Sequence, residues 1–510
     1  MLSRRDFLKI ASLVTASAAL SSCAPAYRRL AGDLPTVPWT ALNASDFLAL
    51  NRLTFGARVE ERARFAEIGL QAYIEEQLDF ESINDFSCDL RLLTFDTLGM
   101  QANELEGISN QLFDGYDRES IPNELRQATL MRQIYSKRQL YEIMVEFWSD
   151  HFNIFIEKGN NFYLKTVDDR EVIRKHALGS FRDLVWASAH SPAMMIYLDN
   201  QANEKSHPNE NYARELMELH TLGVDGGYTQ KDVMELARCL TGWNVKDHFW
   251  LGDFVFKDDL HDTGEKNILG LSIQPSGIKE AEQVIEMLVA HPSTARFIST
   301  KLARRFIADD PPQQLIEKAT QTFLDTKGDI KSVLRVILFE GLNPKGFHEV
   351  PEAPEGGKPL GFARPKYKRP ANFILSALRM LNAETDTVAL QEYLLRMGQF
   401  YFNWPTPDGY PDYSEAWQGN LMPRWQFAFA LIRNELKNTK HNLNTLLDVS
   451  STGILQDDVD SLTSLLLGNP LDRLTRDGLI DSVRGAGATD EETLQIIAAS
   501  IIASPAFQWR

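Results

Sequence analysis

The chain has 510 residues, of which 44% are hydrophobic and 24% are charged, so it can bury a sizeable core and form two or more lobes. Its formal net charge at pH 7 is −17, which excludes the basic surface that nucleic-acid binding requires. Beyond the N-terminal region, no apolar stretch reaches the roughly 18 residues that a transmembrane helix needs.

The N-terminus has the features of an export signal. Residues 3–9, SRRDFLK, match the twin-arginine pattern, and an apolar run over residues 10–20 follows them. The run ends on Leu-Ser-Ser-Cys, which matches a site of lipoprotein cleavage and lipidation at Cys23; the alternative is an ordinary cleaved signal in which Cys23 has no role. We predict a signal peptide over residues 1–22, a lipidated tether over 23–44 and a location in the cell envelope or periplasm. The lipid on Cys23 would then be the membrane anchor.

Helical periodicity continues through most of the chain after residue 44, because apolar residues recur at three- and four-residue steps. The predicted helices include residues 45–53, 127–156, 169–176, 181–189, 192–198, 212–222, 229–240, 291–306, 370–381 and 496–502. Two β-like runs flank a polar tip and predict a single hairpin over residues 249–271. The sequence therefore predicts a mainly α fold, a multi-helix globular body with one small β-hairpin and long irregular loops.

A segment rich in proline and glycine divides this predicted body. Residues 344–365 indicate a linker between a motif-bearing helical lobe over 45–343 and a C-terminal helical lobe over 366–510. The apolar helices of the second lobe are expected to dock on the first. Cys239 falls on the apolar face of a predicted helix, so we favour a buried free thiol over a disulfide with Cys88.

The stretch over residues 207–243 carries the densest group of candidate functional side chains. Tyr212, Leu216 and Leu219 form the predicted buried stripe of its first helix, and Asn209 or Asn211 can cap that helix. Four polar residues on or beside the helix are predicted to be catalytic: Arg214 for anion binding, Glu215 as an acid or base, and Glu218 and His220. The structural alternative is that Arg214 pairs with Glu218 or another carboxylate and fixes how the helices cross.

Candidate metal ligands are spread over separate segments. They are His151, His207, His261 and Asp262, with His220 as a further candidate. Glu218-Leu219-His220 has the wrong spacing for a di-iron Glu-x-x-His motif, and HExxH is absent, so a site would have to be assembled from distant segments. The cofactor is left open, with a divalent metal as the one candidate. The alternative for His151 is a hydrogen-bonded core residue.

An aromatic, proline-rich loop over residues 400–425 is the candidate ligand-binding segment. Trp404, Asp408, Tyr410 and Trp417 place rings beside a carboxylate, as a glycan-binding groove requires; the alternative is a loop whose rings fill gaps between helices. Three basic residues in the helix over 291–306 could receive an anionic ligand or a partner's acidic patch: Lys301, Arg304 and Arg305.

Long stretches of the chain resemble the bacterial domain-of-unknown-function family eighteen-hundred. The matching motifs are FWSDHFNI (147–154), HALGSFRDL (176–184), YLDN (197–200), NENYARELMELHTLGVDGGYTQKDVMELARCLTGW (209–243), HDTGEKNILG (261–270), HPSTARFISTKLARRF (291–306), KRPANFILSALRML (368–381), PTPDGYP (405–411) and ASPAFQ (503–508). Asp150 and His190 are less typical of this pattern than His151, His176 and His220. The resemblance implies a largely helical, exported protein. Members of the family often accompany a second twin-arginine-exported family, fifteen-hundred-and-one, which is similar to sulfatases or phosphatases. It implies no reaction.

Two functions are consistent with these features. The first is an envelope-anchored lipoprotein that acts as a scaffold or accessory factor for a partner enzyme, such as the co-exported sulfatase- or phosphatase-like protein. The alternative is a metal-assisted envelope hydrolase that acts on a polysaccharide or glycoconjugate. The serine-hydrolase GxSxG and the phosphate-binding glycine loop are both absent.

Overall fold

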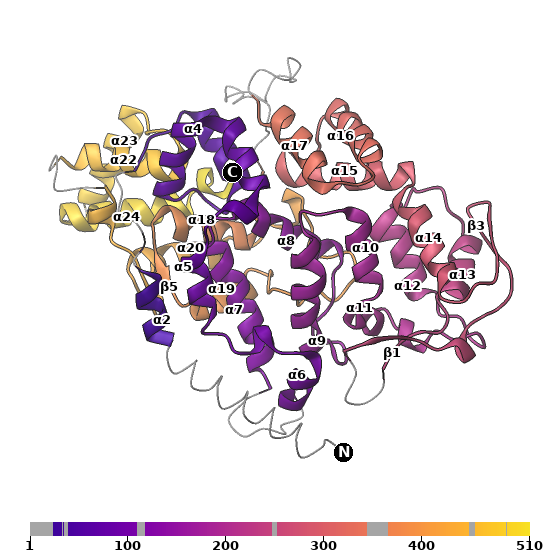
Figure 1. Ribbon diagram of the computed structural model, residues 1–510. Coiled ribbons are helices and arrows are strands. Elements are labelled where there is room, and N and C mark those ends of the chain that lie inside the picture. Colours follow the sequence, from indigo (N-terminus) through magenta and orange to yellow (C-terminus); the bar gives the residue numbers. More distant parts are fainter. Residues whose placement is uncertain are drawn as a thin grey trace.

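A computed structural model describes residues 24–32, 34, 39–109, 118–246, 252–343, 366–447, 454–485 and 487–510. Over these ranges the chain is mainly helical, with three two-stranded antiparallel sheets (Figure 1), so the predicted fold class is confirmed. The predicted signal peptide, Cys23 and the predicted linker over residues 344–365 lie outside the described residues. None of the described helices is long and apolar enough to cross a membrane.

The N-terminal part of the described chain is helical. They are α2 (Ala24–Ala31), α3 (Ala44–Leu53), α4 (Val59–Leu78), η1 (Phe80–Ser82), α5 (Phe86–Leu92), η2 (Thr97–Gly99), α6 (Ala102–Ser109), α7 (Ser120–Tyr135) and α8 (Gln139–His151). Helix α2, which falls in the predicted tether, packs against α5.

The middle of the chain contributes helices and two of the small sheets. Its elements are α9 (Asn161–Asp168), η3 (Asp169–Arg174), α10 (Phe181–Ala189), α11 (Pro192–Tyr197), η4 (Asn200–Ala202), α12 (Glu210–Glu215), η5 (Leu216–Thr221), α13 (Gln230–Cys239), β1 (Trp243–Val245), β2 (Phe254–Phe256), η7 (Asp258–Leu260), β3 (Lys266–Ile268), β4 (Leu271–Ile273), α14 (Lys279–Val289), α15 (Pro292–Phe306), α16 (Gln313–Asp325) and α17 (Ile330–Gly341). Helices α15, α16 and α17 pack on one another.

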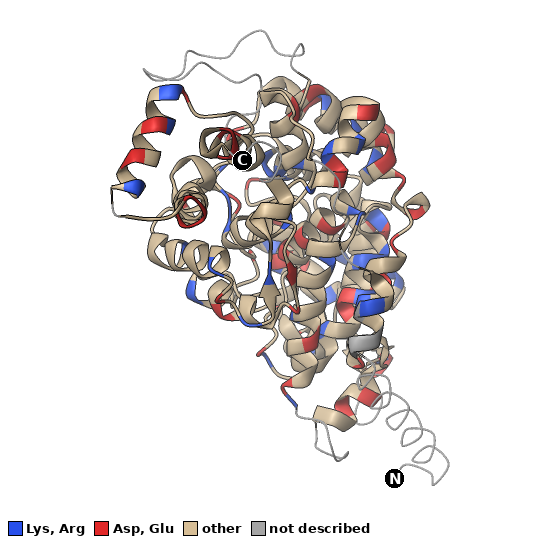
Figure 2. Cartoon of the chain, turned by 90° about the vertical axis from the view of Figure 1, so that its left-hand side faces the viewer, with Lys and Arg blue, Asp and Glu red and all other residues tan. Residues whose placement is uncertain are grey.

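The C-terminal part is again helical. Its elements are α18 (Pro370–Met380), β5 (Glu384–Thr385), α19 (Val388–Arg396), η8 (Ser414–Ala416), α20 (Leu421–Ile432), β6 (Thr439–Lys440), α21 (Leu443–Leu447), α22 (Leu455–Leu467), α23 (Arg473–Arg484), α24 (Asp490–Ala503) and η9 (Ala506–Gln508). Acidic and basic residues are interspersed along the helices of the face in Figure 2.

The predicted continuous helix over residues 127–156 is wrong: the chain breaks between α7 and α8. Ser136 has extended backbone dihedrals there (φ −63°, ψ 138°). The Asp85 carboxylate accepts hydrogen bonds from the Ser136 hydroxyl (2.6 Å) and the Lys137 amide (2.8 Å). These bonds from a distant segment satisfy polar groups at the break, an interaction that local periodicity cannot reveal.

The predicted hairpin is also paired differently from expectation. Strand β2 pairs with β1, and β3 pairs with β4, so the two predicted runs belong to different sheets. Leu269 (φ 51°) and Gly270 (φ 81°) both have positive φ and form the turn between β3 and β4. Two consecutive positive φ values are typical of a type I′ hairpin turn, and leucine is an unusual first residue for it.

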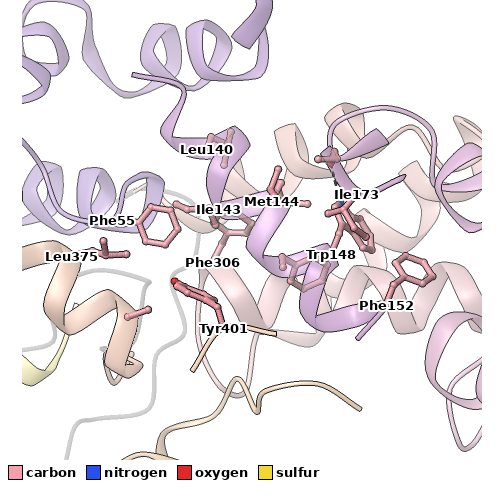
Figure 3. Packing of buried hydrophobic residues seen from close by; sticks show 14 of the residues in the cluster. Phe55, Leu140, Ile143, Met144, Trp148, Phe152, Ile173, Phe306, Leu375 and Tyr401 are labelled. Atoms are coloured by element: carbon pink, nitrogen blue, oxygen red, sulfur yellow. Dashed lines mark hydrogen bonds between the residues drawn. The ribbon is translucent and has the colours of Figure 1, made fainter. Parts of the chain in front are cut away.

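Helix α8 lies at the centre of the hydrophobic core. Its Leu140, Ile143, Met144 and Trp148 lie in one group with side chains from distant segments, such as Phe306 (Figure 3). This core is one connected cluster that includes apolar residues of both predicted lobes. Polar residues carried by α8 are therefore held on a closely packed support.

Candidate active site

A pocket of about 610 Å³ opens where α8 and α15 face the C-terminal part of the chain. Most of its polar lining residues come from α8, α15, the start of α18 and the aromatic loop: Asp150, His151, Lys301, Arg304, Arg305, Arg369, Asp408, Tyr410, Asp412, Tyr413 and Trp417. Phe147, Met397 and Trp404 add apolar surface. Such a concave site, partly aromatic and with convergent charged groups, is the usual form of a small-molecule site.

The aromatic loop is fixed against the end of α8. Asn153 donates hydrogen bonds from Nδ2 to the carbonyls of Trp404 (2.9 Å) and Thr406 (2.7 Å). Gly409 has a φ of +72°, and a Cβ at this position would lie 2.0 Å from the carbonyl oxygen of Asp150. Only glycine therefore allows the loop to approach the helix so closely.

A network of buried charges forms the floor of the pocket. Arg369 donates to Glu146 (3.0 Å) and to Asp150 (2.8 Å), and Arg305 forms a second ion pair with Glu146. Asp412 lies 3.7 Å from both Arg305 and Lys366. Glu146 would have a raised pKa from burial alone, but Arg369 and Arg305 outweigh burial and lower that pKa.

Two of the three carboxylates that line the pocket, Asp150 and Asp412, have pKa values shifted in opposite directions. Burial raises the pKa of Asp150 to about 6, and the charge of Glu146 adds to this effect against the attraction of Arg369. Burial would also raise the pKa of Asp412, but the nearby charges of Lys366 and Arg305 prevail and hold it well below its ordinary value. At pH 6 Asp412 is ionised, whereas about half of Asp150 carries a proton.

Lys301 and His151 form a hydrogen-bonded pair on another wall. The carbonyl oxygen of His220 lies 3.1 Å from His151 Nε2 and can only accept, so Nε2 carries the proton. Nδ1 then accepts from Lys301 Nζ at 2.9 Å. Burial lowers the pKa of Lys301 to about 8, and burial together with the charge of Lys301 lowers the pKa of His151 well below its ordinary value.

The predicted catalytic residues of the 207–243 stretch do not line this pocket. Arg214 instead forms ion pairs with Glu210 (3.1 Å) and Glu218 (3.3 Å), as the structural alternative for Arg214 anticipated. The pKa of half-buried Glu215 is raised by burial and by Glu218. His220 is fully buried, and burial and the charge of Lys301 lower its pKa to about 3, so it is a neutral core residue. Its carbonyl oxygen lies 3.1 Å from Nε2 of His151, which lines the pocket.

A π-helical turn explains why His220 is buried. After α12 the chain widens into η5, where the Leu222 amide bonds to the Met217 carbonyl (2.9 Å). The buried face then includes Tyr212, Leu216 and His220, whereas Leu219, assigned to the buried stripe by an α-helical spacing, is only half-buried. The stripe prediction was therefore wrong at this position because the π turn changes the register.

The predicted metal ligands are not brought together. His207 is exposed, and both ring nitrogens of His151 are hydrogen-bonded as described above. His261 is buried, with Nδ1 2.7 Å from the Thr241 carbonyl and Nε2 3.1 Å from Glu280, and Asp262 is paired with Arg238 (2.8 Å). Over the described ranges, no three His, Cys, Asp or Glu side chains form a group that could hold a metal ion.

All four predicted ligand-binding residues line the pocket: Trp404, Asp408, Tyr410 and Trp417. Tyr410 and Trp417 are almost fully buried, and Trp404 is half-buried with its ring 5.0 Å from that of Tyr410. Asp408 accepts hydrogen bonds from Trp404 Nε1 (3.0 Å) and from the Thr406 hydroxyl (2.5 Å). Part of the Trp404 ring therefore faces the pocket, and its hydrogen bond to Asp408 fixes the orientation of the ring.

Several residues of the site were not predicted from sequence. These residues are Asp150, Asp412 and Arg369. One signal was available for Asp150, which lies four residues after Glu146 on one helix face. No local pattern relates Arg369 or Asp412 to α8, because their proximity depends on the tertiary fold.

Comparison with known proteins gives one family. The family described as "Protein of unknown function (DUF1800)" matches residues 48–509, and the match contains every residue of the pocket. No curated protein and no solved structure matches the chain. Because the match covers nearly the whole sequence, the chain belongs to the DUF1800 family.

Proposed function

We propose that the pocket is an acid–base active site that hydrolyses a polysaccharide or glycoconjugate. The observation that carries this proposal is the pair of carboxyl groups, Asp150 and Asp412, which line one pocket and have oppositely shifted pKa values. Environments that separate two carboxyl pKa values produce an acid and a base from the same functional group. Strongly perturbed groups in a cleft are also typical of catalytic sites.

In the proposed reaction, the protonated Asp150 carboxyl gives its proton to the leaving glycosidic oxygen as the carbon–oxygen bond breaks. The ionised Asp412 stabilises the positive charge that develops on the sugar ring. Water then attacks the ring carbon and gives a proton to the Asp150 carboxylate, which restores the acid. Arg369 positions Asp150 through its 2.8 Å hydrogen bond. Arg305 and Lys366 keep Asp412 ionised.

The aromatic wall supports a saccharide as the substrate class. Trp404 is half-buried and Tyr413 is half-exposed, and both line the pocket beside Asp408. Aromatic rings offer a flat apolar surface to the face of a sugar, while nearby carboxylates accept hydrogen bonds from its hydroxyls.

A screen of the full-length protein against purified polysaccharides and peptidoglycan tests this function. We expect new reducing ends from at least one substrate, and none when Asp150 and Asp412 are both replaced by Asn. Equal release by this double variant and by the wild type would show that another site, or a contaminant, is responsible.

A second candidate function is an accessory role for an exported partner enzyme. Exposed apolar side chains gather where the end of α19 meets the start of α20: Leu395, Leu421, Met422 and Trp425. Apolar groups that remain exposed together often mark protein–protein contacts. The same screen separates the candidates, because a non-catalytic accessory protein would release no reducing ends from any substrate.

We further propose that the protein is exported by the twin-arginine route and anchored through lipid on Cys23, which the SRRDFLK and LSSC sequences support. Replacing Cys23 by Ser should abolish incorporation of labelled fatty acid and move the protein from the membrane fraction to the soluble periplasmic fraction. Replacing Arg4 and Arg5 by Lys should leave the unprocessed protein in the cytoplasm. Labelling that persists in the Cys23→Ser variant would contradict lipidation at this residue.

A further inference from the structure

Helix α15 lines the pocket with two cationic side chains that are not part of the buried ion-pair network around Glu146. Lys301 and Arg304 both line the pocket and lie three residues apart, one turn of the helix. Lys301 Nζ bonds to the neutral ring of His151, and Arg304 Nε bonds to the carbonyl of Asp309 (3.0 Å). Among the described residues, neither has a carboxylate within ion-pair distance.

The other two cations of the pocket differ in this respect. Arg305 and Arg369 each pair with buried carboxylates. Even so, Arg305 is only 1% exposed and its Nε and Nη1 have no hydrogen-bond acceptor among the described residues. Donors without acceptors at this depth cost free energy unless a ligand supplies the missing oxygen atoms.

We propose that the substrate carries an anionic group, a carboxylate, sulfate or phosphate, which binds to Lys301 and Arg304 on the α15 wall. This inference rests on the proposed function and narrows its substrate to an anionic saccharide. An ammonium and a guanidinium together provide charge-assisted donors to two or more oxygen atoms of one anion. His151 acts as a positioning residue, because its neutral Nδ1 holds the Lys301 ammonium without neutralising it.

Lys301 also makes the site sensitive to pH. Its pKa of about 8 means that the ammonium is present below that pH and is lost as the pH rises through it. Asp150, Asp412 and Asp408 favour the charged form of Lys301, and Arg304 opposes it. Affinity for an anion is therefore expected to be highest below about pH 8 and to fall above it.

Titration calorimetry on the full chain tests this site with three probes at constant ionic strength: sodium sulfate, sodium phosphate and sodium glucuronate. We expect saturable binding of at least one, and the preferred probe identifies the anionic group. Lys301→Met and Arg304→Gln should each weaken binding about ten-fold or more. Matched controls remove cations outside the pocket: Arg296→Gln on the same helix, and Lys318→Met on α16.

The outcomes distinguish this inference from the proposed function. Binding that is equally strong in Lys301→Met, Arg304→Gln and the two controls would overturn the anion site. Hydrolysis of a neutral polysaccharide, with no binding of any of the three anions, would overturn the inference but leave the hydrolase proposal standing. Anion binding that depends on Lys301 and Arg304, without hydrolysis of any saccharide, would support the site and contradict the hydrolase. Melting temperatures without anion show whether each variant is folded.

Discussion

Replacing Asp150 by Asn should slow saccharide hydrolysis by about 10²–10⁴-fold, which is the usual contribution of a positioned general acid. The fold should be retained, because the raised pKa of Asp150 shows that the folded protein disfavours its charged form. The amide oxygen of Asn can still accept the hydrogen bond from Arg369. The measurement is the initial rate on the most active substrate of the screen, with the melting temperature as a check of folding.

The pH dependence of the rate provides an independent test of this role. Asp150 must be protonated to act as the acid, so the wild-type rate should fall as the pH rises through about 6. The residual rate of Asp150→Asn should not show that decline. Asp259→Asn is the matched control, because Asp259 is exposed and does not line the pocket, and we expect an unchanged rate. A wild-type rate that stays constant from pH 5 to 8 would remove Asp150 from the mechanism.

The fold class followed from helix periodicity, because buried helices require apolar residues at regular steps. The aromatic loop was also identified from sequence, since Trp404, Asp408, Tyr410 and Trp417 lie close together in the chain and all line the pocket. Local composition is informative when one continuous segment supplies a whole wall.

The charged part of the site could not be predicted in the same way. Glu146 is on α8, Arg305 is on α15, and Arg369 precedes α18, so each ion pair joins segments that are distant in the chain. Conversely, the polar residues of α12 and η5 attracted attention because they are dense in sequence, yet Arg214 and Glu218 pair with each other at the surface. A high density of polar residues along the chain does not show that their side chains are buried or that they meet side chains from distant segments. The charged residues of the pocket have both properties, whereas Arg214 and Glu218 pair within one continuous helical segment.

Replacing Glu146 by Gln should lower the free energy of unfolding by about 3–5 kcal/mol, because the change leaves two buried cations without their shared carboxylate. Glu146, Arg305 and Arg369 are each less than 5% exposed in their side chains. Unfolding by urea, followed by tryptophan fluorescence, measures the effect. Glu75→Gln is the matched control: Glu75 pairs with Arg335 at 2.6 Å, but both side chains are well exposed, and loss of that pair should cost about 1 kcal/mol or less.

The pH dependence of this difference in stability has a defined sign. The pKa of Glu146 is lowered in the folded protein from an ordinary value of 4.5, so its ionised form contributes stability above pH 4.5. That contribution is lost as the pH falls through the lower pKa of the folded state, and the gap between wild type and Glu146→Gln should narrow with it. Combining Glu146→Gln with Arg305→Met should restore part of the lost stability, since one unpaired buried charge is removed along with its partner. If Glu146→Gln destabilises no more than Glu75→Gln at pH 7, the two arginines do not depend on Glu146. Packing against α8, rather than the ion pairs with Glu146, would then keep Arg305 and Arg369 in place at the pocket.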